Sequence, residues 1–156
     1  MPLTILNTRE VKKIKDALRQ QFGHAFQEDY AYLQNDNNRV FIITKDVQQL
    51  ELKNLKIDKM GLYAGEVMRN GEFRLSKEGA QLLVREAQVL GVGLKNTIEL
   101  SEAEVKEYFS GNDLDYEGED RSVLLLYQGD TLGWAMLKEG KILNFLPKIH
   151  RGTVIL

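Results

Sequence analysis

Apolar residues close to the N-terminus recur at helical spacing. Asn7 with Glu10 three residues later has the spacing of a capping box, and Gly23 favours a helix end. Between these two ends the apolar residues lie three or four positions apart: Val11, Ile14, Leu18 and Phe22. This spacing predicts an amphipathic helix between Asn7 and Gly23.

Apolar stretches typical of strands follow, separated by turn-forming residues. FQEDYAYLQ and RVFIIT are separated by NDNN at 35–38. LYAGEVMR and EFRLS flank Asn70 and Gly71, and an Asn-Gly pair between two such stretches is a strong hairpin signal. We therefore expect two strands followed by a β-hairpin.

Two further helical stretches complete the first part of the chain. VQQLELKNL predicts a short helix, and a longer one is expected to begin at Ser76 and end at Gly91. The glycine-containing stretch GVGLKN that follows has little periodicity and predicts a boundary. Residues 1–93 are therefore expected to form a small α/β domain.

The rest of the chain has short strands about ten residues apart. NTIEL is strand-like, and Ser101 with Glu104 predicts a second capping box on a short helix. The polar stretch NDLDYEGED predicts a loop, and a turn at Glu139 and Gly140 separates the last strands. The expected strands are SVLLLYQ, TLGWAMLK, KILNFL and TVIL. This rhythm predicts a small barrel or sandwich over residues 94–156, so the fold class is α+β.

Charge is strongly segregated along this chain of 156 residues and net charge −2. Residues 1–98 carry 15 basic and 12 acidic side chains, whereas residues 99–120 carry nine acids and Lys106 alone. Residues 121–156 return to a positive balance, with five basic and two acidic side chains. The mean charge therefore says little about partners, because nucleic-acid binding depends on a local patch.

The sequence also bears on where in the cell the protein is found. It has no cysteine, which favours an intracellular protein. No apolar run reaches the roughly 18–20 residues of a membrane span, and the first twenty residues lack an export signal. We therefore expect a cytoplasmic protein with no membrane association.

Catalytic motifs are scarce. The two histidines, His24 and His150, lack the spacing of metal ligands, and no serine lies in a GxSxG elbow. GVGLKN lacks the third glycine of a dinucleotide-binding loop. Asp113 and Asp115 lie in the acidic stretch, where a solvated loop is the simpler interpretation. We therefore expect no enzyme, no cofactor and no metal site.

Recognition is the remaining class of function. In LGWAMLKEGKILNFLPKIHRG, Leu132 to Gly152, four basic residues lie among apolar strand residues: Lys138, Lys141, Lys148 and Arg151. Basic side chains next to strands are typical of RNA-binding surfaces, although a solvated edge produces the same composition. Trp134 is expected in the core, with base stacking as the alternative.

The order of elements resembles a known RNA-binding module. NTIELSEAEVKEYFSGNDL followed by SVLLLYQGDTLGWAMLK resembles a PUA domain, a small pseudobarrel. GLYAGEVMRNGEFRLSKEGAQLL is similar to the pre-PUA domain of small ribosome-biogenesis proteins. The last stretch is similar to the C-terminal PUA-like extension of RsmF-type (Nol1/Nop2/fmu) ribosomal RNA cytosine-5 methyltransferases. Leu143 departs from that pattern, which has a lysine before the asparagine.

The resemblance implies a pre-PUA-like α/β domain followed by a PUA-like pseudobarrel that binds RNA. The methyltransferase catalytic domain has no counterpart in this sequence. The implied function is non-catalytic binding of structured ribosomal or transfer RNA in ribosome biogenesis or RNA modification. The alternative is an adaptor that docks onto an RNA methyltransferase, a ribosome-assembly factor or a ribosomal protein. The expected RNA contacts are Lys138, Lys141, Asn144, Lys148, His150 and Arg151.

Overall fold

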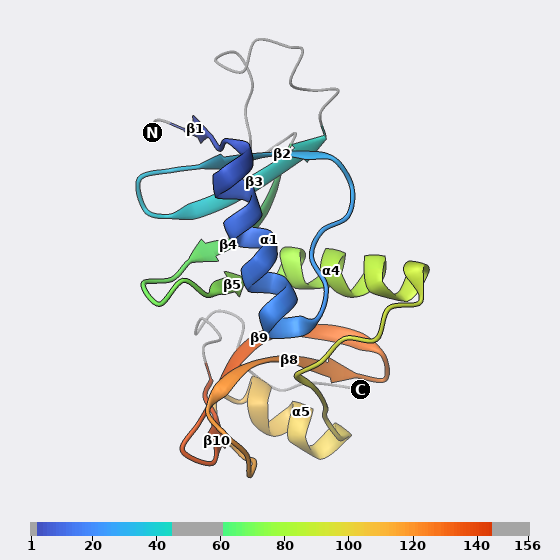
Figure 1. The fold of residues 1–156 in the computed structure, drawn as a ribbon. Helices are drawn as coiled ribbons and strands as arrows, with labels where there is room; N and C mark the ends of the chain where they lie inside the picture. Colours follow the sequence, from blue (N-terminus) through green and yellow to red (C-terminus); the bar gives the residue numbers. More distant parts are fainter. Residues whose placement is uncertain (1–2, 45–60, 145–156) are drawn as a thin grey trace. The chain divides into compact units, whose positions relative to one another are not determined.

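The computed structural model describes residues 3–44 and 61–144. The chain divides into two compact units, Met1–Leu94 and Lys95–Leu156. Each unit combines helices with an almost entirely antiparallel sheet (Figure 1), so the expected α+β class is confirmed. The units are described one at a time below.

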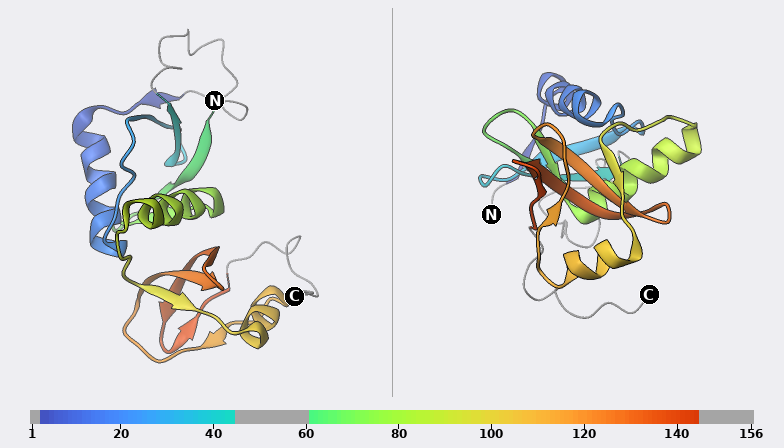
Figure 2. Two further views of the ribbon diagram at one scale, coloured as in Figure 1. Left: turned by 90° about the vertical axis from the view of Figure 1, so that its right-hand side faces the viewer. Right: turned by 90° about the horizontal axis from the view of Figure 1, so that it is seen from below.

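The N-terminal unit is a sheet with two helices packed on its strands. The strands follow one another in the order β1-β2-β3-β4-β5, and each pairs antiparallel with its neighbour. Helix α1 packs against β5, and α4 packs against β4 and β5 (Figure 2). The elements are β1 Thr4–Ile5, α1 Thr8–Phe22, β2 Tyr30–Gln34, β3 Arg39–Thr44, β4 Leu62–Val67, β5 Phe73–Leu75 and α4 Lys77–Leu90.

Helix α1 has the ends that its sequence predicts. Asn7 Oδ1 accepts from the backbone N–H of Glu10 at 2.9 Å, and Glu10 Oε1 accepts from the N–H of Asn7 at 3.1 Å. Gly23 ends the helix at a φ of 83°, a left-handed conformation that glycine adopts without strain. The two caps stabilise a helix whose apolar side lies in the core of the unit, with Leu18 and Phe22 fully buried.

Gln21 ties this helix to the edge of the sheet. Its side-chain Nε2 donates to the carbonyl oxygen of Phe73 at 3.0 Å, and its Oε1 accepts from the N–H of Phe73 at 2.7 Å. The amide thus pairs with β5 as a neighbouring strand would. Because Gln21 is only 7% exposed, these bonds satisfy polar groups that water does not reach.

The C-terminal unit is a strongly curled sheet with one helix (Figure 2). Its strand order is β6-β8-β9-β10-β7; β6 and β8 are parallel, and the other neighbours are antiparallel. Apolar side chains from the strands and the helix form a common core. The elements are β6 Thr97–Glu99, α5 Glu102–Phe109, β7 Leu114–Asp115, β8 Arg121–Tyr127, β9 Asp130–Lys138 and β10 Lys141–Ile142.

Two tight turns connect the central strands of this unit. Gln128 and Gly129 join β8 to β9, and Glu139 and Gly140 join β9 to β10. All four residues have positive φ, between 50° and 84°. Positive φ at both central residues defines the type I′ turn, which matches the twist of an antiparallel pair. The turns therefore fix the register of three consecutive strands.

The structure differs from the sequence expectations at three short elements. Strands β1 and β7 were not predicted, and β7 lies in the stretch expected to be a polar loop. The predicted strand KILNFL is shorter than expected, since β10 ends at Ile142. The capping box at Ser101 and the hairpin around Asn70 are confirmed. The predicted helix VQQLELKNL and strand TVIL lie outside the described residues.

Candidate nucleic-acid interface

Two of the predicted contact residues lie side by side on the C-terminal sheet. Lys138 ends β9 and Lys141 begins β10, and the two are register partners across the turn at Glu139 and Gly140. Side chains of directly opposed residues in an antiparallel pair lie on the same face. The turn thus places two exposed ammonium groups on one face of the sheet.

Asp115 balances one of these two charges. It is the register partner of Lys141 on the other side, in β7, and its Oδ1 lies 2.8 Å from Lys141 Nζ. The hydrogen bond to Asp115 and the attraction of its carboxylate raise the pKa of Lys141, and the same contact lowers the pKa of Asp115. Both side chains are exposed, by 54% and 90%, so water and salt compete with the pair.

Lys138 has no such neighbour. No ion pair or hydrogen bond to its side chain occurs among residues 3–44 and 61–144. These residues form a row across β9, β10 and β7: Lys138, Lys141 and Asp115. The row therefore carries one unpaired cation and one cation in an exposed pair. A phosphate group can accept hydrogen bonds from both lysine ammonium groups, and its negative charge complements theirs.

Asn144 has a role within the fold. Its side-chain Nδ2 donates to the carbonyl oxygens of Asn112, at 3.0 Å, and of Tyr108. Its backbone N–H donates to Asp113 Oδ1 at 2.8 Å. Asn144 thus holds the chain after β10 against the end of α5. It lies beyond the strand on which the sequence placed it, and contact with RNA stays a prediction for this residue.

Leu143 stands where the RsmF-type pattern has a lysine. Leu143 is half-buried, and its N–H donates to the carbonyl oxygen of Met136 at 2.9 Å, which extends the pairing beyond Ile142. A leucine here contributes to packing and offers no charge. Lys148, His150 and Arg151, the other predicted contacts, lie outside the described residues.

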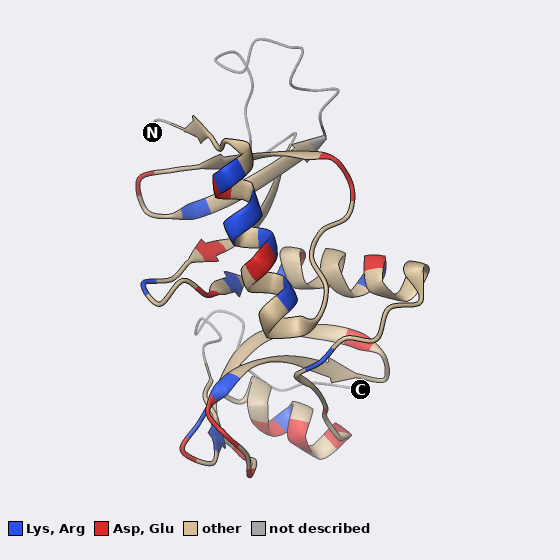
Figure 3. Ribbon diagram, in the orientation of Figure 1, with Lys and Arg blue, Asp and Glu red and all other residues tan. Residues whose placement is uncertain are grey.

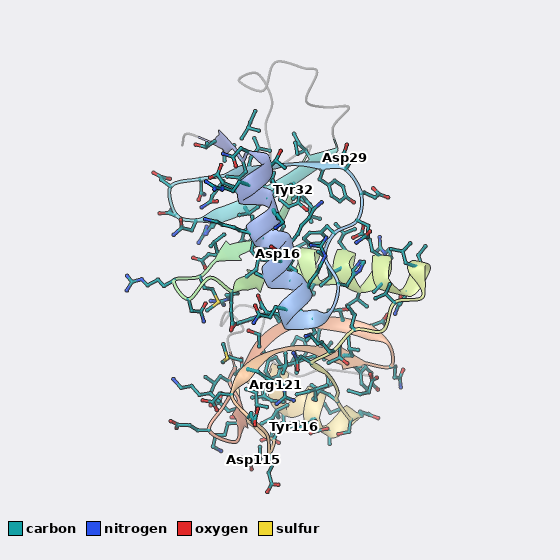
Figure 4. All side chains as sticks on the ribbon, in the orientation of Figure 1. Asp16, Asp29, Tyr32, Asp115, Tyr116 and Arg121 are labelled. Carbon is teal, nitrogen blue, oxygen red and sulfur yellow. The ribbon has the colours of Figure 1, made fainter. Side chains whose placement is uncertain are left out.

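Arg121 and Trp134 also have roles within the fold. Arg121 donates from Nε to Asn96 Oδ1 and from Nη1 to the carbonyl oxygen of Glu119, both at 3.0 Å (Figure 4). These bonds hold the start of β8 to the segment before β6. Trp134 on β9 is only 8% exposed, which confirms the expectation that it lies in the core.

Sequence reasoning missed the importance of Asp115. The residue was interpreted as part of a solvated loop, and its side chain is indeed exposed. Its pairing with Lys141, 26 positions away, depends on the curling of the sheet that brings β7 beside β10. No local pattern signals this contact, whereas the turn at Glu139 and Gly140, between the strands that carry Lys138 and Lys141, was predicted from the sequence.

Acidic side chains are also numerous on this unit. Helix α5 carries three glutamates and Lys106, which pairs with Glu102 at 3.2 Å. Figure 3 shows acidic residues along α5 and the loop that follows it. In the part of the chain that the structure describes, no group of three or more potential ligands is arranged to hold a metal ion. No helix among these residues has the length and apolar character needed to cross a membrane.

Comparison with protein families identifies the C-terminal unit. Residues 95–151 match the family model described as the PUA domain of the methyltransferase RsmF. The C-terminal unit is a PUA domain. The predicted resemblance to the RsmF extension is confirmed, and the curled sheet around α5 is its pseudobarrel. PUA domains are RNA-binding modules, so RNA binding is the class of function that the match supports for this unit.

A solved structure extends the likeness to the rest of the chain. The crystal structure of the hypothetical protein PH0734.1 from the hyperthermophilic archaeon Pyrococcus horikoshii OT3 is similar with a TM-score of 0.50. The sequences are 16% identical, and the likeness covers 97% of this chain and 90% of that one. At this identity the two proteins share a fold. No protein of curated function matches the sequence.

Proposed function

We propose that this protein binds structured ribosomal or transfer RNA through its PUA domain and acts in ribosome biogenesis or RNA modification without catalysing a reaction. The observation that carries the proposal is the match of residues 95–151 to the RsmF PUA domain. RsmF is named as a methyltransferase in that match. A chain that combines a PUA domain with a second α+β unit suits a protein that holds RNA or delivers it.

The proposed contact surface is centred on Lys138 and Lys141. Both are exposed, and they are register partners on neighbouring strands. Two ammonium groups on one face suit two phosphate groups of a folded RNA, because phosphate contacts supply most of the affinity in such complexes. The exposed pair with Asp115 can be exchanged for a phosphate contact. Lys148, His150 and Arg151 are proposed as further RNA contacts on the evidence of the sequence.

Asn144 is proposed as the residue that positions this surface. Its bonds to Tyr108, Asn112 and Asp113 hold the chain that leads from β10 toward Lys148 and Arg151. The glutamates on α5 would repel RNA and so disfavour binding through that helix.

The test is RNA binding measured over a series of salt concentrations. We expect wild-type protein to bind transfer RNA or ribosomal RNA fragments with an affinity that falls steeply with salt. The variant Lys138→Gln/Lys141→Gln should lose about 1.4 to 1.8 from the slope of log affinity against log salt, since each phosphate contact contributes roughly 0.7 to 0.9.

A matched control is available in the same domain. Lys95 is exposed and unpaired among the described residues, as Lys138 is, and Lys106 is in an exposed pair with Glu102, as Lys141 is with Asp115. Lys95→Gln/Lys106→Gln therefore removes the same charges from other positions. Equal loss of affinity in both variants would contradict the proposed site and indicate a general effect of net charge.

The alternative function is an adaptor that docks onto an RNA methyltransferase, an assembly factor or a ribosomal protein. The observation that favours it is the acidic surface of α5 and the loop after it, which complements a basic protein. Pulldown from cell extract, with and without nuclease, separates the two functions. Partners that remain after RNA digestion would favour the adaptor, and partners lost with the RNA would favour RNA binding.

A further inference from the structure

The helices of the protein differ sharply in charge. Helix α1 carries five basic and two acidic side chains, a net charge of +3. Helix α4 carries two of each, and α5 carries one basic and three acidic side chains. Of the three helices that the structure describes, α1 is thus the one with a positive balance, as the basic colour along it shows (Figure 3).

The packing of α1 directs these charges outward. Its apolar residues lie in the core, and Gln21 fixes its C-terminal end to the backbone of Phe73. The opposite side is exposed to solvent. We call this side the outer face of α1 and define it by its exposed basic residues: Arg9, Lys12, Lys13 and Arg19. A capped, anchored helix holds this face in a fixed arrangement.

Acidic neighbours neutralise only part of the outer face. Asp16 pairs with Lys12 at 3.7 Å and with Arg19 at 3.3 Å (Figure 4). Glu10 is occupied in the capping box with Asn7. Arg9 and Lys13 make no ion pair with any residue among 3–44 and 61–144. Two cations one helical turn apart are therefore available to an external anion.

Helix stability does not account for this arrangement. Arg9 lies in the first turn of α1, where the helix dipole favours acidic side chains. Arg9 and Lys13 are also four positions apart, and like charges at this spacing repel each other. Both effects disfavour the folded helix. An anionic partner would remove both, because it neutralises the two cations and interacts well with the dipole.

We propose that the outer face of α1 is a second phosphate-contacting surface, by which the N-terminal unit binds the same RNA as the PUA domain. The inference rests on the proposed function, which supplies a polyanionic partner of the right charge. A hollow of about 220 Å³ lies beside the helix, but Glu10 and Glu72 line it together with Lys13. Lys13 lines this hollow and is also exposed on the outer face, so phosphate groups would reach it from the outer side of α1.

The test compares two double variants of the full-length protein. Arg9→Gln/Lys13→Gln removes the two unpaired cations of α1. The control, Lys77→Gln/Arg85→Gln, removes two exposed basic residues of α4 that are likewise unpaired among the described residues. Both variants change the net charge of the same unit by the same amount, so a difference between them reports position.

Binding to transfer RNA or a ribosomal RNA fragment is measured from low to moderate salt. The α1 variant is expected to lose about 1.4 to 1.8 from the slope of log affinity against log salt, and about tenfold or more in affinity near 0.1 M salt. The α4 control is expected to keep the wild-type slope. Circular dichroism melting of both variants shows that they fold, and Lys13→Gln alone should give about half the change in slope.

The outcomes separate this inference from the proposed function. If wild-type protein shows no salt-dependent RNA binding, the proposed function and the inference both fail. If Lys138→Gln/Lys141→Gln weakens binding and the α1 variant does not, the inference alone is overturned. If the α1 variant keeps its RNA affinity but loses a nuclease-resistant protein partner, the outer face docks a protein, and the inference is again overturned.

Discussion

Gly79 of α4 lies against the backbone carbonyl group of Ala64 in β4, so close that no side chain fits between the helix and the strand. The first prediction concerns this contact. Replacing a glycine by alanine within a helix normally stabilises the helix by about 1 kcal/mol. Here the added methyl group would overlap a backbone atom, and we expect a net loss of about 1–3 kcal/mol in the free energy of unfolding. Urea denaturation measures the difference.

Gly93→Ala is the matched control for that substitution. A methyl group at Gly93 meets nothing within 4 Å, and the backbone there does not require glycine. Its effect should be neutral or slightly stabilising. A loss of stability as large as that of Gly79→Ala would show that the close approach of α4 to β4 is not the cause.

The second prediction concerns the bond between Gln21 and Phe73. Gln21→Ala removes both hydrogen bonds and leaves the buried N–H and carbonyl of Phe73 without this partner. We expect a loss of about 2–4 kcal/mol in the free energy of unfolding, on the basis of roughly 1–3 kcal/mol for each group left unsatisfied. Gln20→Ala, at an exposed position of the same helix, should change stability by less than about 0.5 kcal/mol.

A third prediction follows from the exposed pair of Asp115 and Lys141. The pair lowers the pKa of Asp115 below its ordinary value of 3.8. The stabilising contribution of this carboxylate is therefore present above its unfolded pKa and is lost as the pH falls through the lower, folded value. Titration by NMR should give a pKa below 3.8 for Asp115 in the wild type and a higher one in Lys141→Gln. Equal values in the two proteins would mean that the pair does not persist in solution.

The fourth prediction uses the same pair to test RNA binding. Asp115→Asn removes the carboxylate that competes with phosphate for Lys141. We expect the variant to bind RNA several-fold more tightly at low salt, with a smaller difference at high salt because the charges are exposed and screened. The control is Glu117→Gln, two residues further along, at an exposed position with no ion pair or hydrogen bond to Lys138 or Lys141 among the described residues. An equal gain from Glu117→Gln would assign the effect to overall charge.

The fifth prediction tests Asn144 as a positioning residue. Asn144→Ala removes the donors to the carbonyl oxygens of Tyr108 and Asn112, and we expect a loss of about 1–2 kcal/mol in the stability of the PUA domain. Its RNA affinity should fall without a change in the salt slope, since no charge is removed. Unchanged RNA affinity in a variant of reduced stability would contradict the positioning role.

Elements with local signals could be predicted from the sequence, and elements without them could not. The capping boxes at Asn7 and Ser101 and the hairpin turn at Asn70 are encoded within four residues, and the structure has all three. Strands β1 and β7 are each two residues long, too short for an alternating pattern. They exist because distant strands offer them backbone partners.

The same distinction holds for the candidate site, where some contacts have a local sequence signal and others have none. The Glu139-Gly140 turn indicates that Lys138 and Lys141 are opposed, whereas the approach of Asp115 depends on the closure of the sheet. Asn144 was expected on a strand because four of the six residues of KILNFL are apolar. Strand β10 ends at Ile142 and one further backbone bond follows at Leu143, and the polar bonds to the end of α5 determine where Asn144 lies.

The strands at the sheet edges bear on solubility. In the described part of the chain the two sheets end in strands of only two or three residues: Thr4–Ile5, Phe73–Leu75, Thr97–Glu99 and Leu114–Asp115. A long unpaired edge is a template on which another copy of the chain can add a strand, and short edges offer few backbone groups for this. Gln21 occupies part of the β5 edge as well. All four short edge strands, including β1 and β7 that the sequence did not predict, thus disfavour edge-to-edge aggregation.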